Sequence, residues 1–167
     1  MSKPSTWLPS FLALGVVWGA SFLFIEWALE SLTPIGVAFM RGALGAISLL
    51  IMVAVRKVAL PTRPIEWMHL GVVATLLNAV PGFLFALGQE HVTSVMAGIL
   101  NATTPLMTLL VIGLIFREEK TTSNQIVGLL LGFVGVALVS GIGSGLGEND
   151  LFGVIALLSA TLCYGFS

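Results

Sequence analysis

The chain has 167 residues, of which 57% are hydrophobic and 9% are charged, with a formal net charge of −1 at pH 7. Soluble domains usually carry about 25% charged residues, so this composition predicts a protein that lies in the lipid bilayer. The seven Lys and Arg residues form no basic patch, and the single cysteine has no Cys/His cluster beside it, so we expect no nucleic acid partner, no metal site and no cofactor.

Apolar runs long enough to cross a bilayer, which takes about 20 residues, follow one another along the chain. Five should be complete transmembrane helices, and a sixth run is still apolar at the last residue, so the chain reads as incomplete. The first run is too long for a signal peptide and is expected to be retained. The predicted fold class is an all-α integral membrane protein, a multi-helix transmembrane bundle. The expected spans are Leu8–Leu29, Ile35–Val55, Trp67–Leu87, Val92–Phe116, Ser123–Gly141 and the run that starts at Leu151.

The basic residues outside the spans all fall in alternate connections. They precede the first span, join the second span to the third, and join the fourth span to the fifth, whereas the other three connections have none. By the positive-inside rule, we expect a multi-pass membrane protein with a cytoplasmic N-terminus. The basic residues outside the spans are Lys3, Arg56, Lys57, Arg63, Arg117 and Lys120.

An odd number of spans would place a second copy of the same unit upside down in the membrane. Two short segments support such a repeat, because Trp18-Gly19-Ala20-Ser21 in the first span aligns with Tyr164-Gly165-Phe166-Ser167 in the sixth. Inverted repeats are the usual build of secondary transporters. We therefore expect residues 1–141 to form a first five-helix repeat, 142–150 an external Gly-rich linker, and 151–167 the truncated start of a second, inverted repeat.

Four features of the sequence form a recognisable set. They are WGASF at Trp18–Phe22, the Thr33, Pro34 and Arg41 pattern entering the second span, a proline in the fourth span, and REEKTTSNQIVGLLLGFVGVALV at 117–139. Together they resemble the N-terminal half of EamA-like permeases of the drug/metabolite transporter superfamily. The resemblance implies half of a ten-helix transporter built from two inverted five-helix halves. It also implies a location in the cell inner (plasma) membrane and movement of small metabolites or toxic compounds across it, often outward. Carried over, the pattern falls on Trp18, Gly19, Pro34, Arg41, Pro105, Glu119, Gln125, Gly128 and Gly135.

A set of aromatic and polar residues shares one depth, near the middle of three spans. Polar groups at that depth are costly and often mark a substrate pathway. Three of the four tryptophans fall at span ends, as expected at the membrane interface, but Trp18 does not. Trp18 could form a wall for a flat substrate or fill the bundle core, and the Gly15-x-x-x-Gly19 pattern around it favours close helix packing. The substrate-binding candidates at this depth are Trp18, Asn78, Asn101 and Thr104.

Two mid-span prolines predict helix kinks at the same depth. Pro81 should release the carbonyl of Leu77, beside Asn78, and Pro105 should release that of Asn101. Free backbone groups in the membrane persist where they face protein or a watery cavity, and interrupted helices point to a transporter site. The alternative is a kink in which the hydroxyls of neighbouring threonines bind the released carbonyls.

Arg41 is the one full positive charge inside a span, about 9 Å from its expected outer end. It could simply extend its guanidinium to the interface, or it could pair with Glu26, which lies equally far before the turn between the first two spans. Arg41 is also a candidate substrate-binding residue for an anionic group. Glu26 is the candidate for proton coupling, because it is the only acid well inside a span.

The leading functional hypothesis is a secondary transporter, expected to be an exporter, of small organic metabolites or drugs that works by alternating access around a midplane site. One alternative is a half-size membrane subunit or scaffold that acts as an inverted dimer. The other is an integral membrane enzyme, which the sequence disfavours because it contains no nucleophile or metalloprotease motif. The expected partners are the lipid bilayer, a small-molecule substrate, and the missing second half or a second chain.

Overall fold

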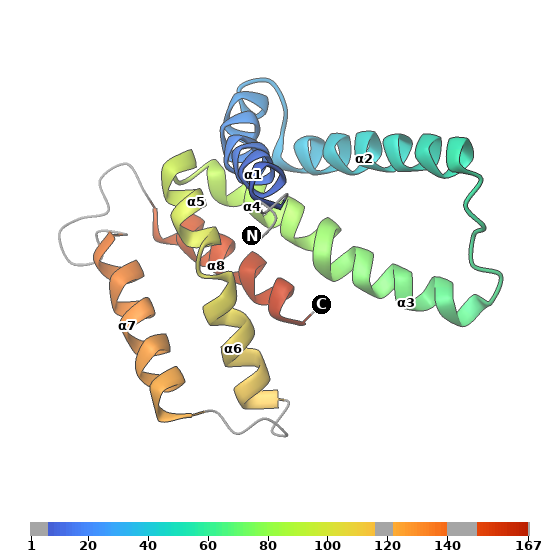
Figure 1. Ribbon diagram of the computed structural model, residues 1–167. Helices are drawn as coiled ribbons and strands as arrows, with labels where there is room; N and C mark the ends of the chain where they lie inside the picture. The colour runs from blue at the N-terminus through green and yellow to red at the C-terminus, as the bar shows by residue number, and fades with distance from the viewer. Residues whose placement is uncertain (1–6, 116–121, 140–149, 167) are drawn as a thin grey trace, which may run out of the picture.

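The computed structural model describes residues 7–115, 122–139 and 150–166, and this part of the chain is helical throughout apart from its connections. Figure 1 shows the helices in their spatial arrangement. The elements are α1 (Trp7–Leu29), α2 (Pro34–Arg56), α3 (Pro64–Ala74), a π-helical turn η1 (Thr75–Ala79), α4 (Val80–Gln89), α5 (Ser94–Asn101), α6 (Thr104–Ile115), α7 (Ser123–Val139) and α8 (Leu151–Phe166).

Four of the predicted spans are confirmed as helices long and apolar enough to cross a membrane. Within the described residues they are Trp7–Leu29, Pro34–Arg56, Pro64–Gln89 and Ser94–Leu114. The fifth prediction, Ser123–Gly141, is only partly matched, because α7 has 17 residues and is about 26 Å long, less than a bilayer core of about 30 Å. Most of the predicted linker at 142–150 lies outside the described residues, which resume at Asp150.

Helix starts follow from local capping chemistry in the sequence. The Thr33 hydroxyl accepts from the backbone N–H of Gly36 at 3.3 Å, and Pro34 occupies the first helical position of α2, where no N–H is needed. The hydroxyl of Thr93 does the same for α5, accepting from Met96 at 3.3 Å. These caps fix where the short connections end and the spans begin.

The third span is interrupted in the turn before Pro81, the residue at which a kink is predicted. In η1 the N–H of Val80 donates to the carbonyl of Thr75, five residues back, so the hydrogen-bond ladder is shifted by one residue. Pro81, which lacks an N–H, follows directly and is buried. The predicted disturbance is therefore present, and it takes the form of a π turn that contains Asn78.

The helix α8 lies at the centre of the described structure, packed against α4, α5 and α6 (Figure 1). It contributes Val154, Leu157 and Ala160 to the hydrophobic core. Its N-terminus is held by the N–H of Asp150, which donates to the His91 carbonyl at 2.8 Å, and by the contact of the two side chains at 3.4 Å. The helix α8 thus shares one hydrophobic core with residues of α1, α2, α4 and α5.

The helices α4 and α8 come together at a pair of glycines. A Cβ built on Gly153 would lie 2.8 Å from the Gly88 carbonyl oxygen and 2.8 Å from the side chains of His91 and Val92. Such spacing leaves no room for any side chain. By contrast α2 and α3 extend away from this core in Figure 1, and their many exposed apolar side chains suit contact with lipid.

Candidate functional site

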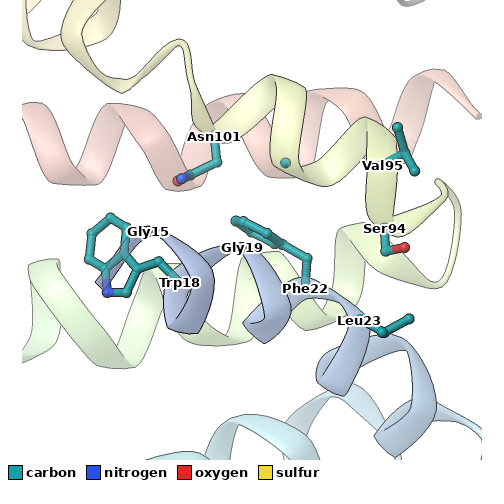
Figure 2. A pocket seen from close by; sticks show the side chains of 9 residues that line it. Gly15, Trp18, Gly19, Phe22, Leu23, Ser94, Val95 and Asn101 are labelled. Atoms are coloured by element: carbon teal, nitrogen blue, oxygen red, sulfur yellow. The ribbon is translucent and has the colours of Figure 1, made fainter. Parts of the chain in front are cut away.

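A groove between α1 and α5 brings together two of the predicted site residues, Trp18 and Asn101. Its volume is about 490 Å³, within the range typical of small-molecule sites. Figure 2 shows Trp18 and Asn101 near one end of the groove and Ser94 and Val95 at the other. None of the residues that line it is ionisable, so the groove offers an aromatic ring, an amide and apolar walls.

The α1 wall of the groove is a single helical stripe. Gly15, Trp18, Gly19 and Phe22 occupy positions i, i+3, i+4 and i+7 and so share one face of the helix. Among the described residues, the two glycines do not mediate the predicted close helix packing, because a Cβ built on either would have no neighbour within 4 Å. Their missing side chains instead leave the space that forms the groove beside Trp18.

The α5 wall ends at the predicted break before Pro105. The helix α5 stops at Asn101 and α6 begins at Thr104. The Thr104 hydroxyl donates to the Asn101 carbonyl at 2.7 Å, and the Thr103 hydroxyl donates to the Leu100 carbonyl at 2.6 Å. The alternative in which hydroxyls bind the released carbonyl is therefore the observed one, and the break places the Asn101 side chain at the end of the groove without leaving its carbonyl unpaired.

Two other predicted residues are not part of this groove. Asn78 lies in the π turn with its side chain exposed, and it does not line the space between α1 and α5. Thr104 is partly buried and is engaged with the Asn101 backbone. The four candidates that were predicted to share one depth therefore do not form a single cluster of side chains.

Arg41 lines a different groove, which lies between α1 and α2 and has a volume of about 250 Å³. Ile25 and Ala28 form part of its α1 wall, and Val37 and Met40 form part of its α2 wall. The structure thus separates Arg41 from Trp18 and Asn101, and Glu26 lines neither groove.

The predicted pairing of Glu26 with Arg41 is wrong, since the structure records no ion pair between these two described residues. Counting residues from the hairpin turn gives equal depth, but it does not say toward which side of its helix each side chain points. Both side chains are exposed.

Because Glu26 and Arg41 do not touch, Glu26→Gln and Arg41→Gln should have additive effects on stability. The double variant should match the sum of the single changes within about 0.5 kcal/mol in unfolding measurements. A larger difference would show that the two groups interact after all.

One residue of this region was not singled out by the sequence. Gln89 is only 6% exposed, and its Nε2 donates to the Phe22 carbonyl at 2.8 Å, which ties α4 to the groove-lining helix α1. Its Oε1 is buried and has no hydrogen-bond partner among the described residues. In the sequence, Gln89 is a polar residue at the end of an apolar run. Because most spans end in this way at the membrane interface, the pattern does not distinguish Gln89 from an ordinary span end.

Comparisons with known proteins agree on the kind of protein this chain resembles. A sequence model of the EamA-like transporter family matches residues 5–141. The chain is 30% identical over 164 residues to the uncharacterized inner membrane transporter YedA of Escherichia coli K12, covering 95% of this chain and 52% of YedA. It is 28% identical over 157 residues to protein PagO of Salmonella typhimurium, covering 92% of this chain and 51% of PagO.

A third relative, an uncharacterized transporter of Archaeoglobus fulgidus, is 28% identical over 134 residues, which are 77% of this chain and 46% of the relative. The chain therefore spans about half the length of the curated relatives it matches. No solved structure matches.

Proposed function

Because the chain belongs to the EamA-like transporter family, we propose that it forms part of a secondary transporter whose substrate binds in the groove between α1 and α5. The chain is a multi-pass membrane protein, and two of the three relatives described above are named as transporters. The proposed substrates are small organic metabolites or drugs, and the proposed direction is outward. Alternating access would expose the groove to the two sides of the membrane in turn.

The observation that carries this proposal is the position of Trp18 near Asn101 in an uncharged groove (Figure 2). An indole face favours flat or apolar groups, and the Asn101 amide offers both a donor and an acceptor. A substrate with a flat apolar body and one polar group would satisfy both. A groove without ionisable lining residues suits a neutral substrate better than a strongly charged one.

The proposed orientation places the N-terminus and the basic connections in the cytoplasm of the cell, at the inner membrane. The argument rests on the alternation of basic residues between connections. In this orientation the turns between α1 and α2 and between α4 and α5 face outward.

The test is transport by the protein expressed from its complete reading frame. Cells that lack the gene would be complemented and grown on a panel of toxic small organic compounds, and efflux of a protective hit would then be timed. We expect Trp18→Ala and Asn101→Leu each to lower the initial efflux rate at least about tenfold, equivalent to about 1.4 kcal/mol of lost binding or barrier lowering.

Matched controls use the same residue types outside the groove. Trp7→Ala changes an exposed tryptophan at the start of α1, and Asn124→Leu changes an exposed asparagine in the first turn of α7. Both should transport at nearly the original rate with equal membrane expression. Normal efflux by the Trp18 and Asn101 variants would reject the groove as the substrate site.

A further inference from the structure

The groove between α1 and α2 has a different chemistry from the proposed substrate groove. Its walls are mainly apolar, with Phe24, Ile25 and Ala28 from α1 and Val37 and Met40 from α2. Among the described residues, Arg41 is the only ionisable one that lines it. The groove therefore combines a space suited to a hydrocarbon chain with a single positive charge.

The charge of Arg41 is not neutralised by an acidic partner in the part of the chain that the structure describes. The only ion pair recorded there joins His91 to Asp150, and Glu26 makes none with Arg41. An arginine among apolar side chains is costly unless an anion or water compensates it. Charge complementarity therefore calls for an anionic group at the mouth of this groove.

We propose that the groove between α1 and α2 binds one acyl chain of an anionic phospholipid, whose phosphate pairs with Arg41. Guanidinium binds phosphate through two parallel hydrogen bonds, which favours arginine at such a site. Arg41 lies seven residues after the first residue of α2, about 10 Å along the helix. An arginine side chain is long enough to extend from this depth to the interface, where the phosphate of a lipid lies.

This lipid would fill the space at the α1–α2 hairpin and link two helices that otherwise make limited contact there. The helix α2 packs mainly against α4, and its contact with α1 is smaller. The acyl chain would lie against Phe24 and Ile25 on one wall and Met40 on the other. The proposal does not depend on which substrate the protein transports or on where that substrate binds.

Native mass spectrometry of the complete protein, purified in detergent with added dioleoyl phosphatidylglycerol or dioleoyl phosphatidylcholine, tests the proposal. We expect one phosphatidylglycerol to be retained about tenfold more strongly than phosphatidylcholine. Arg41→Gln should reduce phosphatidylglycerol retention to the level of phosphatidylcholine. Arg41→Lys should keep part of the preference, because it keeps the charge but not the paired hydrogen bonds.

Arg56→Gln is the matched control, since Arg56 is an exposed arginine at the other end of the same helix and should not affect retention. Ala28→Phe keeps Arg41 but fills the groove, and should abolish retention of both lipids. This variant decides the question should Arg41→Gln fail to purify as a folded protein.

Three results would overturn the proposal. The first is equal retention of phosphatidylglycerol by the original protein and by Arg41→Gln or Ala28→Phe. The second is an equal loss in Arg56→Gln, which would mean that cationic residues near the membrane interface attract the lipid without a defined groove. The third is displacement of the lipid by millimolar glycerol phosphate, which would indicate a site for the anion alone.

Discussion

Replacing Gly153 with leucine should destabilise the protein by roughly 3 kcal/mol or prevent α8 from docking. Even a Cβ at this position would lie 2.8 Å from the carbonyl oxygen of Gly88. That neighbour is backbone and cannot rotate out of the way. A leucine would therefore force α8 away from α4, and the core would lose the contacts of Val154, Leu157 and Ala160.

The measurement is the free energy of unfolding in lipid nanodiscs or mild detergent, followed by far-UV circular dichroism. Gly45→Leu is the matched control, because a Cβ at Gly45 of α2 would have no neighbour within 4 Å in the part of the chain that the structure describes. Removing a glycine from an exposed helix should be neutral or stabilising by up to about 1 kcal/mol. Equal stability of the two variants would show that α8 does not pack on α4 through Gly153.

The spans and their interruptions could be predicted because their causes are local. An apolar run of sufficient length and a proline without an N–H act wherever the chain is placed. The sequence motifs also indicated the family correctly, as the match over residues 5–141 confirms. The form of each interruption could not be predicted, because the backbone can adapt to the N–H that a proline lacks in more than one way. A π turn precedes Pro81, whereas before Pro105 the Thr104 hydroxyl binds the Asn101 carbonyl.

The composition of the candidate site could be predicted only in part, because depth in the membrane is one coordinate and the direction of a side chain is another. Trp18 and Asn101 have the same predicted depth, and their side chains line the same groove. Asn78 has the same predicted depth, but its side chain does not line that groove. The same limit explains the failed Glu26–Arg41 pair. Glycines are ambiguous for a related reason, since Gly19 opens a groove while Gly153 permits close packing.

The central position of α8 could not be predicted from the sequence either. An apolar segment of 16 residues at the end of the chain reads as the start of something that follows. Its packing depends on a close approach between Gly153 and Gly88, which lies 65 residues earlier. The local sequence around either glycine does not show that the two will meet. The sequence therefore predicts this apolar helix but not the helices against which it packs.

Replacing Gln89 with glutamate should cost roughly 3–5 kcal/mol of stability at neutral pH, as expected for an uncompensated buried charge. The Gln89 amide is 6% exposed, and its only recorded hydrogen bond is the one that Nε2 donates to the Phe22 carbonyl. A carboxylate there would lose this donor and set two acceptor oxygens against each other. The loss should be smaller in acid, because a protonated carboxyl group can donate to the Phe22 carbonyl.

Gln89→Met provides the control, since it keeps a similar shape without polar atoms. It removes one hydrogen bond, but it also removes the Oε1 atom that has no partner among the described residues, so the net change should stay within about 1 kcal/mol. Unfolding of both variants would be measured at neutral and at acidic pH. If Gln89→Glu were as stable as the original protein at neutral pH, Oε1 would have to face water or a donor, and the contact between α4 and the groove helix α1 would be wetter than its burial indicates.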